Sequence, residues 1–342
     1  MSTASTIKDT QLPTRPLGRT GMDITRVGFG AWAIGGPDWA VGWGPQDDED
    51  SVSAIRHAIA RGVNWIDTAA IYGLGHSEEI VGRALADLPL SERPYVFTKC
   101  GQVWDPNLRN TKFRVGKAAS IKAECEDSLR RLGVERIDLY QMHWPAEDGT
   151  ELEEYWQALL DLKAEGKVRA VGLSNHQVPL LERAEKLGHV DTLQPGLSAI
   201  HRAAAEKELG WCAAHETGVI VYSPMQSGLL TGRFSAGRVA GLPDSDWRSR
   251  HPDFTEHLAR NLEVVDAMRP VAERHETSIA AVAIGWTLAW KAVTGAIVGA
   301  RNPEQVDGWL DAPRLELSDE DLREIGEAIV ASGAGEGPAF PE

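Results

Sequence analysis

Two oppositely charged residues, Asp67 and Lys99, each end a short apolar run of the kind that forms a buried strand. A charge carried into a protein interior is tolerated when it is paired with an opposite charge. We therefore expect Asp67 and Lys99 to form an ion pair where neighbouring strands end. An ion pair that only stabilises the fold is the alternative.

Tyr72 lies in a glycine-containing loop shortly after Asp67, where it can swing back over the strand ends. A tyrosine hydroxyl has a pKa near about 10 and is a poor acid at neutral pH. A nearby ammonium such as Lys99 stabilises the phenolate and lowers that pKa, so the hydroxyl becomes a usable proton donor. His143 ends a later apolar run and can donate a hydrogen bond to a carbonyl oxygen. Metal binding is the other use of such a histidine, but the chain contains no His-x-His or His-x-x-x-His pair.

Short β-rich runs alternate with segments of helical periodicity, and these elements must position the four side chains. The expected strands are 26–30, 63–67, 95–99, 137–143, 168–174, 192–194, 219–223 and 296–299. The expected helices are 48–60, 77–86, 117–131, 151–163, 178–186, 203–215, 256–290 and 318–331, the last beginning at a near capping box. A hairpin is expected within 15–25.

This alternation is typical of an α/β fold built as a single parallel (β/α)₈ TIM barrel with an N-terminal β-hairpin and long substrate loops. A doubly wound sheet would usually carry Gly-x-Gly-x-x-Gly after its first strand, whereas residues 28–33 read Gly-Phe-Gly-Ala-Trp-Ala. We expect a flexible lead at 1–14, the barrel at 15–332 and a flexible tail at 333–342. No linker or internal repeat marks a further domain boundary.

Composition excludes several classes of protein. The 342 residues include 35 Lys and Arg against 50 Asp and Glu, a formal net charge of −15, which argues against nucleic acid or an anionic membrane as partner. The apolar stretch 279–290 is too short to span a bilayer, and the N-terminus lacks a signal-peptide pattern. Three scattered cysteines without a Cys-x-x-Cys pair argue against a disulfide framework or a structural zinc site, so we expect a cytoplasmic protein.

Polar residues end most of the expected strands, and a barrel of this kind carries its active site on the loops that follow them. Several of these motifs resemble the aldo-keto reductase superfamily, in the bacterial type that uses NADP. They are Asn-Trp-Ile-Asp-Thr-Ala at 64–69 followed by Tyr72, Thr-Lys at 98–99, Asp-Leu-Tyr-Gln-Met-His at 138–143, Gly-Leu-Ser-Asn at 172–175, Gln194, Tyr-Ser-Pro at 222–224, Gly-Leu-Leu-Thr-Gly at 228–232 and Gly-Ala-Arg at 299–301.

The resemblance implies a barrel that binds NADPH or NADP⁺ in extended form without a Rossmann domain. It implies that Tyr72 is the general acid, that Lys99 lowers its pKa, that Asp67 is the partner of Lys99, and that His143 orients the carbonyl. The implied cofactor residues are Trp32; Ser174, Asn175 and Gln194 at the nicotinamide carboxamide; Tyr222 stacked on the nicotinamide; Ser223, Met225, Ser227, Gly228 and Leu229 around the pyrophosphate; and Gly299, Ala300, Arg301, Asn302 and Gln305 at the adenosine 2′-phosphate.

Two positions depart from the family pattern. Leu197 stands where members often have an aromatic residue, and Val-Asp-Gly-Trp at 306–309 replaces the usual Glu-Asn continuation after Gln305. The adenine contacts are therefore not assigned to Gly308 and Trp309.

The substrate side is less defined. Trp32, Trp104 and Trp144 each follow an expected strand and could wall a site for a bulky or cyclic carbonyl, or for a sugar ring; packing under loops is the alternative. The long loop 233–255 is expected to close over cofactor or substrate.

The leading interpretation is an NADPH-dependent oxidoreductase that interconverts aldehydes or ketones and alcohols, with a small-molecule partner. The alternative is a nucleotide-sensing regulatory subunit like the potassium-channel β-subunits, which share the implied fold. A barrel isomerase or hydrolase is a third interpretation, and it would need a metal cluster or a different phosphate site.

Overall fold

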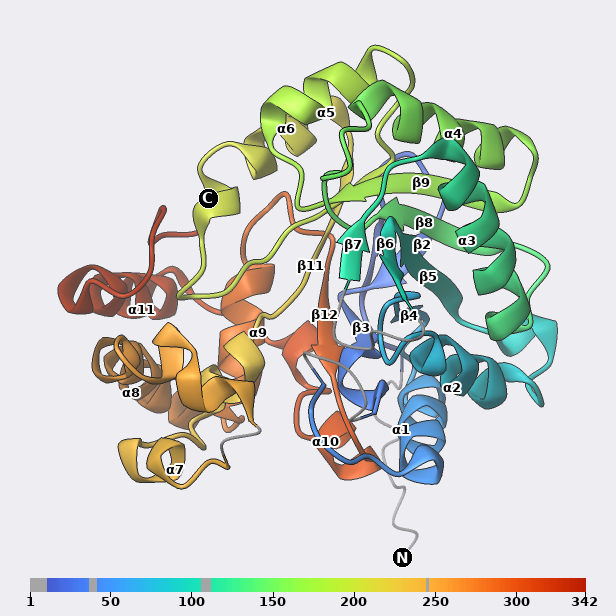
Figure 1. The fold of residues 1–342 in the computed structure, drawn as a ribbon. Coiled ribbons are helices and arrows are strands. Elements are labelled where there is room, and N and C mark those ends of the chain that lie inside the picture. Colours follow the sequence, from blue (N-terminus) through green and yellow to red (C-terminus); the bar gives the residue numbers. More distant parts are fainter. Residues whose placement is uncertain (1–10, 37–41, 106–111, 244–245) are drawn as a thin grey trace, which may run out of the picture.

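The computed structural model describes residues 11–36, 42–105, 112–243 and 246–342. Its centre is a closed barrel of parallel strands in the order β10-β11-β12-β3-β4-β5-β8-β9 (Figure 1). These strands are β3 Val27–Gly30, β4 Trp65–Asp67, β5 Tyr95–Cys100, β8 Ile137–Met142, β9 Val168–Ser174, β10 Thr192–Gln194, β11 Gly218–Val221 and β12 Gly295–Gly299. The predicted α/β barrel is confirmed, and because the strands are parallel their carboxyl ends share one rim.

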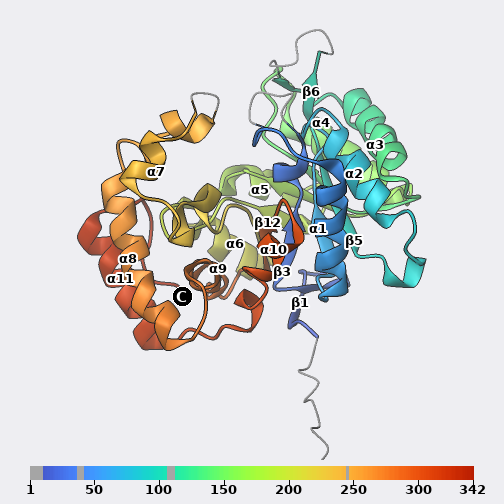
Figure 2. The same ribbon diagram turned by 90° about the horizontal axis from the view of Figure 1, so that it is seen from below.

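Helices surround the barrel and bury its outer face, except the short α7, which lies in the loop 233–255. They are α1 Asp48–Ala60, α2 His76–Leu85, α3 Ala118–Leu132, α4 Leu152–Ala164, α5 Val178–Glu185, α6 Glu208–His215, α7 Ala236–Ala240, α8 Leu258–Arg274, α9 Ile279–Leu288, α10 Pro303–Asp307 and α11 Asp319–Ser332. Figure 2 shows α8 and α11 together on the flank opposite α2 and α3. The capping box expected at Ser318 is present, with Asp321 as its second member.

The interior of the barrel is filled from the end opposite the rim. The hairpin of β1 Thr14–Pro16 and β2 Asp23–Thr25 places Leu17 and Ile24 against Trp65, whose indole N–H donates to Thr25 O at 2.8 Å. Gly28 leaves room for the Trp65 ring, since a Cβ at this position would overlap the indole. Because apolar side chains fill the barrel at this end, its polar side chains lie at the other end, where the strands have their carboxyl ends.

Two predicted helices have a different form, and one pair of strands was not predicted. The expected helix 203–215 is a 3₁₀ turn at Ala203–Ala205 followed by α6. The expected helix 256–290 is two helices, α8 and α9, because Ser278 caps a new start by accepting from Ala281 N. A further antiparallel pair, β6 Gln102–Trp104 and β7 Lys112–Arg114, follows β5 and was not expected from the sequence.

The C-terminal segment 333–342, expected to be mobile, packs against the barrel instead. The guanidinium of Arg202 is buried and donates to Ala334 O at 3.1 Å and to Gly337 O at 3.3 Å. Ala339 is also buried, and Lys291 N donates to Glu342 O at 3.1 Å. A buried guanidinium needs carbonyl acceptors, and the tail supplies them. Of the expected flexible lead, residues 1–10 lie outside the described residues, whereas Leu12 is buried.

Candidate active site

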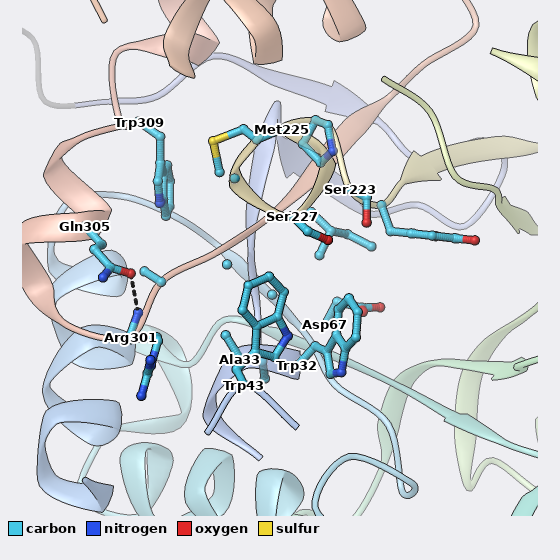
Figure 3. Close-up of a pocket in the computed structure, with 18 of the residues that line it drawn as sticks. Trp32, Ala33, Trp43, Asp67, Ser223, Met225, Ser227, Arg301, Gln305 and Trp309 are labelled. Carbon is cyan, nitrogen blue, oxygen red and sulfur yellow. Dashed lines mark hydrogen bonds between the residues drawn. The ribbon is translucent and has the colours of Figure 1, made fainter. Parts of the chain in front are cut away.

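The strand ends open into a cavity of about 730 Å³ (Figure 3). Most of the residues singled out in the sequence line it: Trp32, Asp67, Tyr72, His143, Trp144, Ser174, Asn175, Gln194, Tyr222, Ser223, Met225, Ser227, Gly228, Gly299, Ala300, Arg301, Asn302 and Gln305. Lys99 and Leu229 lie beneath the surface of the cavity, both fully buried. Trp104 does not line the cavity but packs against Ala69 and Ile71. Of the two roles expected for Trp104, the structure therefore shows packing rather than a wall of the cavity.

Asp67 and Lys99 form the expected ion pair. Lys99 Nζ lies 2.6 Å from Asp67 Oδ1 and also donates to Thr68 O at 2.9 Å. The second carboxylate oxygen accepts from Gln194 Nε2 at 2.9 Å. Burial raises the pKa of Asp67 and lowers the pKa of Lys99, since it disfavours both charges, while each partner's charge acts in the opposite direction. The ammonium and the carboxylate therefore depend on each other for their charged forms.

Tyr72 lies beside this pair, with Lys99 Nζ 5.3 Å from the centroid of its ring. Burial raises the pKa of Tyr72 well above its usual value, and the charge of Asp67 raises it further. This is the opposite of the direction expected from the sequence, because the charge of Lys99 is compensated by Asp67 and the desolvation of the phenolate dominates. Tyr72 is consequently a protonated phenol at neutral pH, the form that a proton donor requires.

The loop that carries Tyr72 is held by tight backbone contacts. Tyr72 N donates to Ala69 O at 3.0 Å, and Ser77 N donates to Tyr72 O at 3.1 Å. Gly73 follows with a φ of +62°, and a Cβ there would overlap the carbonyl oxygen of Gly35. Only glycine fits this close approach, which fixes the direction in which Tyr72 enters the cavity.

His143 faces Tyr72 across the cavity. The two rings meet edge to face with their centroids 5.7 Å apart. The backbone of His143 is anchored on both sides, because its N–H donates to Cys100 O at 3.0 Å and its carbonyl accepts from Asn175 Nδ2 at 3.0 Å. The proton donor and the histidine thus converge on one small volume.

Residues from β9 to β11 continue the cavity away from Tyr72. Tyr222 Oη donates to Asn175 Oδ1 at 2.8 Å, and Ser174 Oγ donates to Gln194 O at 2.8 Å. These bonds hold the side chains in place before any ligand arrives, while the face of Tyr222 lines the cavity.

The segment after β11 has an unusual backbone. Ser223, Gln226 and Ser227 all have positive φ values, of 58°, 43° and 52°. Such conformations cost free energy and cluster where a backbone is shaped around a ligand, and turns of this kind direct N–H groups towards anions. This backbone fits the expected pyrophosphate position.

Arg301 lies at the far end of the cavity, where a smaller hollow of about 260 Å³ adjoins it. Its guanidinium donates to Gln46 Oε1 at 2.6 Å and to the carbonyl of Pro45. Asp47 and Asp50 line the same hollow. The basic group expected to hold a phosphate is therefore already hydrogen-bonded and has acidic neighbours.

Sequence reasoning missed several lining residues. Trp43 lies against Trp32 with ring centroids 5.4 Å apart, and Trp309 lines the cavity near Gln305 (Figure 3). Trp43 lies late in the long loop between β3 and α1, and Trp309 follows α10, so neither stands close behind a strand end as Trp32 and Trp144 do. The loop 233–255 contributes Phe234 to the lining, as expected of a loop that covers the site, but it contains α7 and two 3₁₀ turns.

The lining as a whole fits a nicotinamide dinucleotide. It offers preset hydrogen-bond groups and an aromatic face near Tyr72, a backbone shaped for a pyrophosphate, and a guanidinium at the far end. Within the described part of the chain, no helix is long and apolar enough to cross a membrane.

Comparisons with known proteins agree with this geometry. The aldo/keto reductase family profile matches residues 26–330. The chain is 35% identical over 331 residues to an NADH-specific methylglyoxal reductase from Escherichia coli (strain K12), covering 92% of this chain and 98% of that protein. It is 32% identical over 310 residues to aldo-keto reductase YhdN from Bacillus subtilis (strain 168), covering 90% of each.

A solved structure is similar over the whole chain. The glycerol dehydrogenase AKR11B4 from Gluconobacter oxydans superposes with a TM-score of 0.85 at 35% identity, covering 98% of this chain and 100% of that one. The chain therefore belongs to the aldo/keto reductase family of oxidoreductases, which act on carbonyl compounds with a nicotinamide cofactor.

Proposed function

We propose that this chain reduces small aldehydes or ketones to alcohols, and catalyses the reverse reaction, with Tyr72 as the general acid. The convergence of Tyr72 and His143 above the buried Asp67–Lys99 pair carries the proposal. A carbonyl oxygen within reach of both side chains can accept a hydrogen bond from His143 and a proton from Tyr72 Oη. The bound nicotinamide cofactor supplies the hydride.

The ion pair prepares the site for the charge that proton transfer leaves behind. Once Tyr72 has given up its proton, the phenolate needs a nearby positive charge, and Lys99 is the cation beside it. Asp67 keeps Lys99 charged in a buried position, and Gln194 holds Asp67 in place. The family resemblance likewise pairs Asp67 with Lys99 and places Lys99 beside Tyr72, but it assigns Gln194 to the nicotinamide carboxamide rather than to Asp67.

We propose small, oxygen-rich carbonyl compounds as substrates. Two relatives at 35% identity are named for methylglyoxal and for glycerol, both three-carbon compounds. The cavity beside Tyr72 is walled by the rings of Trp32 and Trp144. The size of the proposed substrate therefore rests on the two relatives, and the two rings supply an apolar wall.

Replacement of Tyr72 by phenylalanine tests the proposal. General acid catalysis contributes about 10²–10⁴-fold, so kcat of Tyr72→Phe should fall by at least about 100-fold on a panel of small aldehydes. The dissociation constant of the cofactor, measured by fluorescence quenching, should change little. Tyr95→Phe is the matched control, because Tyr95 begins β5 at the opposite end from Lys99. Retention of more than half of the wild-type kcat by Tyr72→Phe would refute the role of Tyr72.

We further propose that Arg301 makes NADPH the preferred cofactor, by a modest margin. A guanidinium matches phosphate oxygens, and only NADPH carries a 2′-phosphate. A hydrogen bond to a charged group contributes about 1.5–3 kcal/mol, but Arg301 must first give up Gln46, which offsets about 0.5–1.5 kcal/mol. At the middle of each range, about 1.3 kcal/mol remains, which is a net preference of about 8-fold. Because the methylglyoxal reductase that this chain resembles is NADH-specific, the affinities of this chain for NADPH and NADH must be compared directly.

Dissociation constants of NADPH and NADH for two variants test the role of Arg301. Arg301→Ala should lose most of the preference while barely changing the affinity for NADH. Arg233→Ala is the control, because Arg233 also lines the cavity but no contact ties it to the hollow at Arg301. Equal affinities in the wild type, or an equal loss for both cofactors in Arg301→Ala, would show that Arg301 does not select NADPH.

A further inference from the structure

Gln102 is a buried polar residue in the wall of the cavity, and the mechanism above does not use it. Its side chain is 4% exposed, and its Oε1 has no hydrogen-bond partner among the described residues. Leaving a buried acceptor unpaired costs free energy comparable to a lost hydrogen bond. Native proteins seldom keep such an atom without a use, so Gln102 calls for a ligand.

The backbone directs Gln102 into the cavity. β5 pairs with β8 in a register that places Cys100 beside Met142, so the chain reaches the level of His143 as it leaves the strand. Gly101 then turns with a φ of +79°, and a Cβ there would overlap the Met142 sulfur. Gly101 N donates to Glu124 Oε2 at 2.8 Å, which anchors the turn from α3. This turn breaks the alternation of the strand and brings Gln102 to the lining.

The position of Gln102 separates it from the cofactor residues. Apart from Trp32, which follows β3, those residues lie at or after the ends of β9 to β12. Gln102 follows β5, between the strand of Asp67 and the strand that leads to His143. The cavity that Gln102 lines is also lined by Tyr72 and His143, and by the apolar residues Ile71 and Trp144. An unpaired acceptor in the lining of a substrate cavity can be paired by a polar group of the substrate.

The structure assigns Gln102 as a specificity residue that recognises a hydroxyl group next to the reacting carbonyl, so that 2-hydroxy aldehydes and ketones are the favoured substrates. A hydroxyl both donates and accepts, so it satisfies a carboxamide through either its oxygen or its nitrogen. A substrate with a methyl group in the same place would leave Oε1 buried and unpaired. This inference rests on the proposed function and names the substrate class for the same site.

Glycolaldehyde and propanal form a matched pair for the test, since they differ by a hydroxyl in place of a methyl group. The ratio of their kcat/KM values should favour glycolaldehyde in the wild type, and should fall about tenfold in Gln102→Met, which keeps the side-chain length and removes the polar atoms. Because hydration of glycolaldehyde is the same in both assays, it cancels when the ratios are compared. Propanal turnover by Gln102→Met should stay within about threefold of wild type.

Two further measurements separate recognition from a structural role. Gln102→Glu keeps an oxygen at the same position and should retain a larger glycolaldehyde preference than Gln102→Met. Cofactor affinity should be the same in all three proteins. The melting temperature of Gln102→Met should be no lower than that of the wild type, because this variant removes an unpaired buried acceptor, whereas Gln102→Glu should melt lower because it places a carboxyl in a buried position. An unchanged ratio in Gln102→Met, or an equal loss on both aldehydes, would overturn the inference while leaving the proposed function intact. Wild-type protein that reduces neither aldehyde would overturn both.

Discussion

Removal of the buried ammonium by Lys99→Met should destabilise the protein by an amount that increases with pH. In the wild type, Asp67 is 3% and Lys99 0% exposed in their side chains, with 2.6 Å between the charged atoms. Without Lys99, the carboxylate keeps Gln194 as a partner but has no compensating charge. Breaking a buried pair in this way costs about 3–5 kcal/mol.

The free energy lost in Lys99→Met cannot exceed the free energy needed to protonate Asp67, because a neutral carboxyl needs no compensating charge. Burial already raises the pKa of Asp67, so in Lys99→Met we expect a neutral carboxyl in the folded state and a carboxylate with a pKa of about 3.9 in the unfolded state. The folded protein then binds one more proton, and the free energy of unfolding falls by about 1.4 kcal/mol per pH unit above pH 4. The penalty is thus about 1.5 kcal/mol at pH 5 and about 4 kcal/mol at pH 7. The wild-type pair, ionised in both states, adds no such slope.

Thermal unfolding at several pH values measures this difference. A chain of 342 residues gains roughly 0.7 kcal/mol/K of entropy on unfolding, so the Tm of Lys99→Met should lie about 2 °C below wild type at pH 5 and about 6 °C below it at pH 7. In the double variant Asp67→Asn with Lys99→Met, the gap should become independent of pH, because no titrating carboxyl remains. A gap that does not change between pH 5 and pH 7 in Lys99→Met would refute the reasoning.

Three further predictions concern parts of the fold away from the ion pair. Asp321 is buried; burial alone would raise its pKa, but hydrogen bonds from His275, Ser318 and Arg274 hold that pKa well below its usual range. Asp321→Asn should therefore lower Tm by about 3–5 °C at neutral pH, and the gap should narrow only below about pH 4, where the unfolded carboxylate takes up protons. Gly28→Ala should destabilise the barrel by about 3 kcal/mol or more, because the new Cβ overlaps the Trp65 ring; an unchanged Tm would contradict that packing. Gly210→Ala, in α6 with open space around its Cβ, should instead stabilise by about 0.5–1 kcal/mol, which the same melting assay detects.

Many residues of the candidate active site could be predicted from the sequence to lie together, because the signals that mark them are local. Charges at the ends of apolar runs must be paired, so the sequence alone identifies Asp67 and Lys99 as partners. The end of each strand is also a local signal, and in a parallel barrel every such end reaches the same rim. For this reason Ser174, Gln194 and Tyr222, far apart in the chain, could be assigned to one site.

The tertiary structure decided whatever depends on partners distant in sequence. The bond between Arg301 and Gln46 joins residues 255 positions apart, and it changes the expected strength of phosphate binding. The place of Trp43 in the cavity lining also had to come from the structure, because no strand end close to Trp43 marks it. The contacts of the C-terminal segment 333–342 are a further case, because they depend on hydrogen bonds from the distant Arg202. Side-chain types alone do not reveal which of several possible partners a buried group will meet.

The shift of the Tyr72 pKa also separates what the sequence indicates from what the folded structure decides. The sequence established that a tyrosine, a lysine and an aspartate would be neighbours, and it favoured the attraction between phenolate and ammonium. Only the structure shows that Asp67 already neutralises Lys99 and that Tyr72 is buried, so desolvation dominates and raises the pKa. Electrostatic free energies depend on distance and on exposure to water, and both are properties of the folded chain rather than of its sequence.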